Sequence, residues 1–598
     1  MTLSRWSLSR RPLSRRAVLA LAGAAALPLP ALAADRAPTF PALSKRWLDG
    51  MLALGPVNAT ALGDHRHDGA LDDLSEAGRN AASAFSHKIM SELGKIDIAR
   101  LPRADQVDAK MLENALRFDL WSRDTLKDWS WDPLIYTNLA GQALYGLMAR
   151  EFAPLPKRLG AAIARIEKMP VLWAQMRANL DPVRVPAIHA ETAAKQHPGV
   201  VSLADDLIVA QAGVLNPAGR ARLDKAVARL KTESAAHQTW LDKTLIPAAK
   251  GDFRLGAEHY DQKLAFLLAT PLTRMEIRKR AEVAMAKTRD EMYAQARKVL
   301  AGRPGTPATP EKPSPGEQQA AIKAALDLAA AERPARDKLV ETAERTLATA
   351  TDFVRKKDLI TLPDALVKVI LMPKFQQGVA VAYCDWPGPL DKGLPTFYAV
   401  SPIPDDWSVE KADSFLREYN DRGIQEIAIH EAMPGHYVQG AHANAYPSVL
   451  RAALASGSFV EGWAMYAEHV MADTGFLDGD PLYLITHLKV RLRAISNAIL
   501  DQAIHVDGID RDAAMKLMVE DAFQEQGEAD GKWTRARVTS GQLSTYFVGY
   551  EEHWALRHDT EHRWGPDFAL KRYHDTALSF GSPPVRFAGQ LMLDQPIQ

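Results

Sequence analysis

Apolar residues recur at helical spacing through the first half of the chain, from about residue 40 to residue 300, and few stretches there alternate with period two. In PKRLGAAIARIEKM, for example, Leu159, Ile163 and Ile166 fall on one face of a helix. Hydrophobic residues make up 47% of the chain and charged residues 24%, which is the balance of a globular protein with a sizeable core. We therefore predict a layer of antiparallel helices. Three prolines are expected to interrupt it: Pro102, Pro154 and Pro247.

A proline-rich segment separates this half from the rest. Residues 302–317 read GRPGTPATPEKPSPGE, and five prolines predict a surface loop or linker rather than a helix or central strand. The segment divides a helical N-terminal region, residues 34–301, from a C-terminal region, residues 318–598, that carries the informative motifs. Runs rich in β-formers predict a small sheet at 367–372, 379–383 and 396–400. The predicted fold class is mainly α, a large helical body with a small β-sheet beside the motif helix.

The first 33 residues have the composition of an export signal. They contain arginines and no acidic residue, and an apolar run leads to the small-x-small sequence Ala31-Leu32-Ala33. Arg15 and Arg16 resemble a twin-arginine signal, which predicts a periplasmic or secreted protein. The apolar run is too short to span a bilayer, so we expect no stable membrane span.

The charge balance and the cysteine content narrow the classes of partner and site. The chain has 73 basic and 73 acidic residues, so it lacks the basic surface that a dedicated nucleic-acid binder needs. It has one cysteine, Cys384, which cannot form an intramolecular disulfide or supply a zinc-thiolate cluster. Any metal must therefore be held by histidine and carboxylate side chains.

The motif HEAMPGH places two histidines and a glutamate close together in the sequence. His430 and His436 offer two imidazoles for a zinc ion, and Glu431 stands beside the first as a possible general base. On an uninterrupted helix a spacing of six residues would turn His436 about 240° away from His430. We expect Pro434 and Gly435 to break the helix, with a positive φ at the glycine, and so return His436 toward the metal. The alternative is a helix C-terminus with two partly buried histidines.

The third protein ligand of the zinc ion is expected in the helical pattern GSFVEGWAMYAEHVMADTGF. Glu461 and Glu468 lie seven residues apart, hence on the same side of this predicted helix, among aromatic residues. Burying a carboxylate there without a partner is costly, and a metal is one such partner. Pairing with arginine or lysine is the alternative, which we favour for Glu468.

HEAMPGHYVQ followed by FVEGWAMYAEHV resembles the bacterial domain-of-unknown-function 885 (DUF885) family, grouped with zincin-like metallopeptidases. The resemblance extends across the chain after the signal. FVEGWA is similar to the segment that supplies the third zinc ligand in helical zincins of the thimet-oligopeptidase and carboxypeptidase types. The resemblance thus implies one zinc ion bound by His430, His436 and Glu461. It also implies a strand beside the site that binds extended substrate through its edge, for which 396–407 is the candidate.

Three further residues are candidates for supporting roles. Asp501 and His505, at positions i and i+4, could orient a ligand or bind substrate, together with Glu468; a purely structural pair is the alternative. Tyr546 resembles the tyrosine with which helical zincins stabilise the oxyanion, or else is a core tyrosine.

The sequence as a whole predicts an exported zinc metallohydrolase that acts on a peptide or small amide substrate. Zinc would polarise the scissile carbonyl and acidify its bound water, and Glu431 would transfer the proton to the leaving nitrogen. Two alternatives remain open. One is a non-catalytic periplasmic binding protein with a vestigial metal site, and the other is a zinc hydrolase of non-peptide amides.

Overall fold

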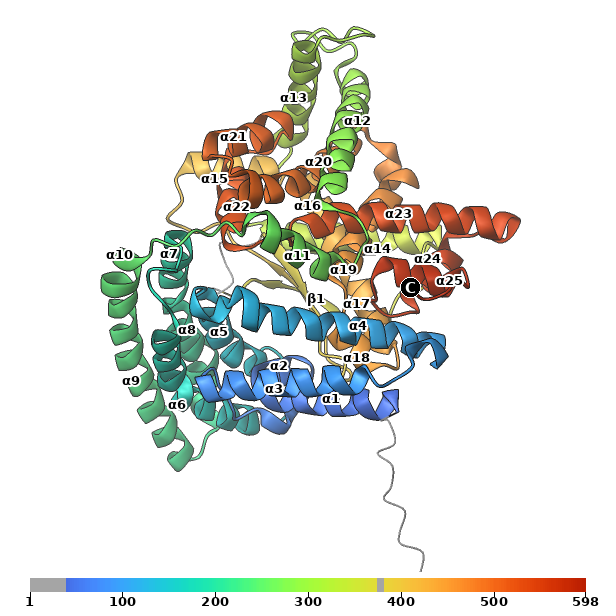
Figure 1. Ribbon diagram of the computed structural model, residues 1–598. Helices are drawn as coiled ribbons and strands as arrows, with labels where there is room; N and C mark the ends of the chain where they lie inside the picture. The colour runs from blue at the N-terminus through green and yellow to red at the C-terminus, as the bar shows by residue number, and fades with distance from the viewer. Residues whose placement is uncertain (1–38, 374–380) are drawn as a thin grey trace, which may run out of the picture.

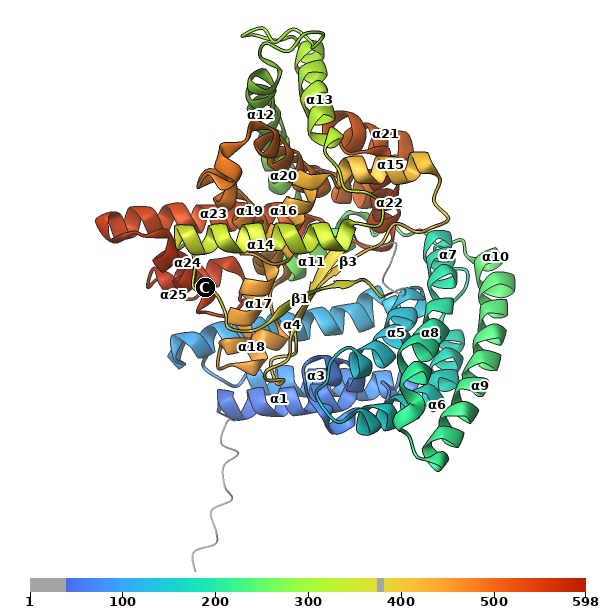
Figure 2. The same ribbon diagram turned by 180° about the vertical axis from the view of Figure 1, so that it is seen from behind.

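The computed structural model describes residues 39–373 and 381–598. The predicted export signal, residues 1–33, and the start of the predicted strand 379–383 lie outside the described residues. The N-terminal half is a stack of helices, drawn in blue to green in Figures 1 and 2. Its helices are α1 (Phe40–Leu54), α2 (Pro56–Ala61), α3 (Glu76–Leu93), α4 (Arg103–Trp121), α5 (Leu134–Met148), α6 (Leu155–Asn179), α7 (Ala187–Gln196), α8 (Pro198–Leu203), α9 (Pro217–Trp240), α10 (Ile246–Ala248) and α11 (Gly256–Leu268).

The apolar residues that recur at helical spacing in this half are buried in the structure. Leu159, Ile163 and Ile166 on α6 are all buried in a cluster with residues of α5 and α9. Helices α4 and α6 begin directly after Pro102 and Pro154, where proline supplies a fixed φ and no amide hydrogen is needed. The mainly helical prediction is confirmed.

The proline-rich segment joins two helices that project from the top of the molecule in Figure 1. These are α12 (Arg274–Leu300) and α13 (Pro315–Ala331). The last three residues of the predicted loop 302–317 already belong to α13, because Pro315 occupies its first turn and Ser314 caps it. Helix α12 packs against α20 (Pro481–Gln502), so its residues contact the C-terminal half.

The C-terminal half contains a three-stranded sheet with helices packed against it. The strands are β1 (Val367–Leu371), β2 (Ala382–Asp385) and β3 (Thr396–Val400). The remaining helices are α14 (Leu339–Lys357), α15 (Val409–Glu418), α16 (Asp421–Glu431), α17 (His436–Ala445), α18 (Val449–Ala453), α19 (Gly457–Asp473), α21 (Arg511–Met515), α22 (Gln526–Val538), α23 (Ser544–Trp564), α24 (Leu570–Leu578) and α25 (Val585–Met592). Helices α14 and α16 pack against the sheet.

The sheet has the order β1-β3-β2, with β1 parallel and β2 antiparallel to β3. The strand prediction at 396–400 is confirmed, but the expectation that 396–407 offers an edge to substrate is wrong. Both edges of β3 are already paired, Tyr398 with Val369 on one side and with Cys384 on the other. Among the described strands, β2 is the edge strand that packs against α16.

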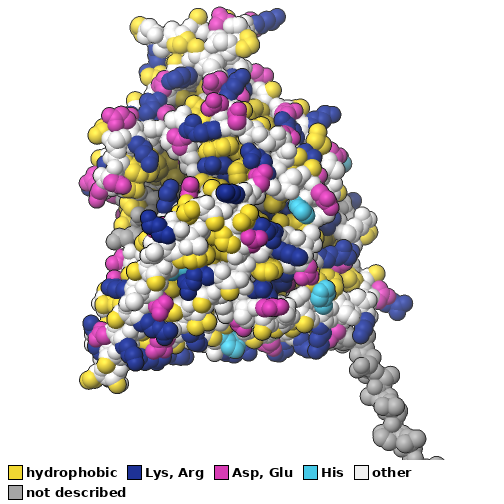
Figure 3. Space-filling view, turned by 60° about the vertical axis from the view of Figure 1, so that its left-hand side comes forward, with side chains coloured by type: hydrophobic (Ala, Val, Ile, Leu, Met, Phe, Trp, Pro, Cys, Tyr) yellow, Lys and Arg dark blue, Asp and Glu magenta, His cyan; other side chains and the backbone are white. Residues whose placement is uncertain are grey.

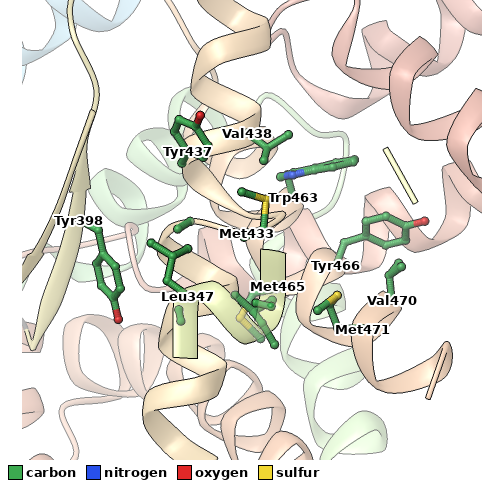
Figure 4. Packing of buried hydrophobic residues seen from close by; sticks show 14 of the residues in the cluster. Leu347, Tyr398, Met433, Tyr437, Val438, Trp463, Met465, Tyr466, Val470 and Met471 are labelled. Carbon is green, nitrogen blue, oxygen red and sulfur yellow. The ribbon is translucent and has the colours of Figure 1, made fainter. Parts of the chain in front are cut away.

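The largest hydrophobic cluster fills the space between the sheet and the C-terminal helices (Figure 4). Tyr398 from β3, Tyr437 and Val438 from α17, and Trp463 and Tyr466 from α19 all contribute to it. Each is almost fully buried. This core fixes α16, α17 and α19 relative to one another, which matters because these helices carry the predicted site.

A buried ion pair joins the two halves. Arg451 on α18 is fully buried and its Nε donates to the carboxylate of Asp108 on α4 at 2.6 Å. The surface is mixed, since basic and acidic side chains are interspersed over the face shown in Figure 3. No helix within residues 39–373 and 381–598 combines the length and apolar character needed to span a bilayer.

Candidate metal centre

The HEAMPGH motif bends the chain so that its two histidines face each other. Helix α16 ends at Glu431 and α17 begins at His436, with a four-residue turn between them. The His430 and His436 rings lie 4.7 Å apart, nearly perpendicular at 83°. The interruption of the helix therefore brings together two side chains that a continuous helix would separate, as the sequence predicts.

The glycine achieves this in a different way from the one predicted. Gly435 has φ −75°, not a positive φ. It is needed because the backbone passes so close to the end of α16 that a Cβ would lie 2.0 Å from the carbonyl oxygen of His430. Its amide donates to the carbonyl oxygen of Ile429, and the indole of Trp463 donates to that of Pro434. Space, rather than a left-handed conformation, excludes a side chain here.

Glu461 on α19 completes a triad of potential ligands. Its Oε2 lies 3.6 Å from Nε2 of His430 and 3.5 Å from Nε2 of His436. This oxygen is buried and has no hydrogen-bond partner. The three side chains each offer a ligand atom within 4.8 Å of the others. Two imidazoles and one carboxylate form the donor set of a catalytic zinc site with an open fourth position, so these residues fit a zinc ion.

Glu468 lies behind His430. Its Oε1 is 2.7 Å from Nδ1 of His430, so a proton on Nδ1 would leave Nε2 free to face Glu461 and His436. This carboxylate-histidine arrangement is typical of the support behind metal-binding histidines. The expected arginine or lysine partner for Glu468 is wrong, because its ion pair is with His430.

The pKa values of His430 and Glu461 show that opposite charges stabilise each other in this pocket. Burial alone would lower the pKa of His430, but Glu461 and Glu468 raise it well above its usual value. Burial would raise the pKa of Glu461, but His430 and His436 outweigh it and hold this pKa below the usual range. The pocket thus favours positive charge, whether carried by protons or by a cation.

Tyr546 reaches the site from α23. Its ring lies 6.4 Å from that of His430, and its hydroxyl accepts a hydrogen bond from Nη2 of Arg535 at 3.1 Å. Helices α19 and α23 approach closely at Gly462 and Gly549, where a Cβ on either would meet the backbone of the other helix. The glycine that follows Glu461 therefore lets Tyr546 come near the histidines.

Glu431 lies on the sheet side of the site. It is half-buried, and its charge adds to the effect of burial in raising the pKa of Cys384 on β2 and of Tyr398 on β3. Among the described residues, none forms a hydrogen bond or an ion pair with its carboxylate. A carboxylate that is next to a metal ligand and unengaged is suited to accept a proton.

The structure places Asp501 and His505 away from this group. Asp501 accepts from the amide of Gly541, and His505 Nε2 lies 2.9 and 2.7 Å from the carbonyl oxygens of Ala536 and Thr539. Burial raises the pKa of Asp501 to about 6 and lowers that of His505 to about 4. These contacts fit the structural alternative, in which the pair anchors the loop that precedes α23.

Sequence reasoning missed three residues near the site. Arg535 holds the hydroxyl of Tyr546, and no local pattern marks it. Glu426 and His487 form a second group with Glu468. Glu426 lies four residues before His430 on α16, so the i, i+4 spacing was a readable signal for a shared face.

Comparisons with known proteins identify relatives that match most of the chain. The family described as "Bacterial protein of unknown function (DUF885)" matches residues 56–592. A solved structure described as a "putative lipoprotein of unknown function" from Shewanella oneidensis is 33% identical, with a TM-score of 0.77 over 93% of this chain and 100% of that one. A "putative lipoprotein" from Colwellia psychrerythraea is 16% identical, with a TM-score of 0.75 over 92% and 98%, and this likeness shows the fold alone. No match is found among curated proteins.

Proposed function

Because this chain belongs to the DUF885 family, whose function is unknown, we propose its activity from its own site: zinc-dependent hydrolysis of peptides or small amides. The observation that carries the proposal is the convergence of His430 and His436 on one carboxylate oxygen of Glu461, which is buried and has no hydrogen-bond partner. The similarity of the two motifs to zincin-like metallopeptidases supports the same reading. A zinc ion held there would act as a Lewis acid on the scissile carbonyl and on a water molecule.

The protein's own side chains have separate roles in this proposal. Glu431 accepts a proton from the attacking water and delivers it to the leaving nitrogen. Glu468 fixes the ring of His430 through Nδ1. The hydroxyl of Tyr546 donates a hydrogen bond to the carbonyl oxygen of the substrate as negative charge develops on that oxygen. Its hydrogen is available for this bond because the hydroxyl oxygen accepts from Arg535.

The proposed location is outside the cytoplasm. The two structural relatives are described as lipoproteins, which supports an exported protein, and residues 1–33 have the features of a twin-arginine signal. The single cysteine, Cys384, lies in β2, so the proposal for this chain is export without a lipid at residues 1–33. Replacing Arg15 and Arg16 by lysine should retain the precursor in the cytoplasm, and unchanged export would point to another route.

The function is tested by digestion of a peptide library with the purified chain. We expect cleavage that stops on chelation of the metal and returns when Zn²⁺ alone is added back. His436→Ala should be inactive, and His442→Ala serves as its matched control, because His442 lies on the same helix, is half-buried and hydrogen-bonds to the carbonyl oxygen of Thr361. Cleavage that survives chelation, or that persists in His436→Ala, contradicts the proposal. Metal binding without cleavage of any peptide or amide would favour the non-catalytic alternative.

A further inference from the structure

A second group of ligand-type side chains lies directly behind the first. Glu426 from α16, Glu468 from α19 and His487 from α20 have exposed fractions of 1%, 1% and 3%. Each offers a ligand atom within 4.8 Å of the others. We propose that these three residues bind a second divalent cation of the zinc type, distinct from the ion proposed between His430, His436 and Glu461.

The hydrogen bonding of the group is incomplete without a cation. Glu468 uses Oε1 for His430, and Oε2 of Glu426 lies 3.3 Å from Nδ1 of His487. The remaining atoms, Oε2 of Glu468, Oε1 of Glu426 and Nε2 of His487, are buried and have no hydrogen-bond partner. One unsatisfied atom on each of three side chains is unusual in a protein interior, where nearly all polar atoms are paired. A bound cation would engage the free lone pairs of these three side chains.

The charges of the group also call for a cation. Two carboxylates this deeply buried need compensating positive charge. Within the described part of the chain, no lysine or arginine forms an ion pair with Glu426 or Glu468. The neighbouring Arg493 is engaged by Glu418 and Glu528. A divalent ion would balance both carboxylates at once.

The donor set indicates the class of ion. One imidazole and two carboxylates suit zinc and similar first-row divalent metals, and the single nitrogen disfavours calcium or magnesium. The hydroxyl of Tyr483 is buried beside Glu426: burial raises its pKa well above the usual value, and the interaction with Glu426 raises it further. Because the group is buried, substrate could not reach an ion there, so this would be a structural site rather than a catalytic one.

A cation bound by this second group would also affect the site formed by His430, His436 and Glu461. Glu468 belongs to both, since one oxygen faces His430 and the other belongs to the second group. A cation there would fix the Glu468 carboxylate and so the orientation of the His430 ring. The second ion would therefore act as a positioning element without touching substrate.

The test is the zinc stoichiometry of the metal-free full-length chain, titrated with Zn²⁺ alone and read by calorimetry and by elemental analysis after desalting. Wild type should bind two zinc ions per chain. His436→Ala should keep one, Glu426→Gln should keep one, and the double variant should keep none. Glu418→Gln is the matched control, because Glu418 is a buried carboxylate outside the group, paired with Lys489 at 2.7 Å, and it should keep two.

The outcomes separate this proposal from the proposed function. If the wild-type chain binds one zinc ion and Glu426→Gln also binds one, the proposal of a second site is wrong. Bound protons would then compensate the charges of Glu426 and Glu468. Unchanged stoichiometry in His436→Ala counts against the first site and not against the second. If Glu426→Gln fails to fold, anomalous diffraction from zinc-loaded wild-type crystals decides: a peak between Glu426 and His487 supports the proposal, and its absence overturns it.

Discussion

Replacing Gly435 by alanine should damage the metal site without touching any ligand. A Cβ at this position would lie 2.0 Å from the carbonyl oxygen of His430 and 2.3 Å from that of Ile429. Ordinary carbon-oxygen contacts begin near ~3.3 Å, so the turn must open by about 1.3 Å at its tightest point. His436 is the next residue and must move with the turn, whereas zinc ligands tolerate deviations of only about 0.2 Å.

The expected loss is at least that caused by disturbing the support of a ligand, about 10–100-fold in zinc affinity or roughly 1.4–2.7 kcal/mol. The assay is competition for Zn²⁺ against a chelator of known affinity, with circular dichroism to confirm folding. Gly160→Ala on α6 is the matched control, since a Cβ there meets nothing within 4 Å and alanine favours a helix. If Gly435→Ala binds zinc with the affinity of the wild type, the close approach of residue 435 to the end of α16 does not control the position of His436.

Three further predictions follow from other contacts. Asp108→Asn leaves the charge of Arg451 buried without its partner and should lower the free energy of unfolding by about 3–5 kcal/mol in urea denaturation; a change below ~1 kcal/mol contradicts this. Burial alone would lower the pKa of His65, but Asp391 and Asp68 raise it to about 9, so this histidine should stabilise the fold below pH ~6.5 and lose that effect as the pH rises through about 9. The difference in melting temperature between wild type and His65→Gln should therefore shrink over that range, and a constant difference would contradict it. Tyr546→Phe should lower kcat by about 10²–10³-fold with little change in KM, and an equal kcat would remove the tyrosine from the mechanism.

The helical body and the main site motif were predictable because both depend on local sequence. Helical periodicity over long stretches identifies buried faces such as that of Leu159, Ile163 and Ile166. The HEAMPGH interruption is also local, since a proline and a glycine together end one helix and allow another to begin. The approach of His430 and His436 across that turn could therefore be anticipated from the proline and glycine between them.

The features that escaped prediction depend on contacts between distant segments. Whether β3 is an edge or a central strand is decided by the pairing of both neighbours with it, which no local pattern encodes. Arg535 on α22 reaches Tyr546 on α23 only because the chain folds back between the two helices. His487 joins Glu426 and Glu468 from a third helix, so its role becomes visible only once α16, α19 and α20 are packed together.

The variant Glu431→Gln tests the proposed hydrolytic mechanism most directly, because it separates proton transfer from metal binding. Glutamine keeps the size of the side chain and its capacity for hydrogen bonding but removes its basicity. Zinc content and peptide hydrolysis are to be measured on the same preparation. We predict zinc content equal to wild type and turnover reduced by at least ~10²–10⁴-fold, about 3–5 kcal/mol of barrier. Hydrolysis at the wild-type rate, or loss of zinc from the variant, would contradict the role assigned to Glu431.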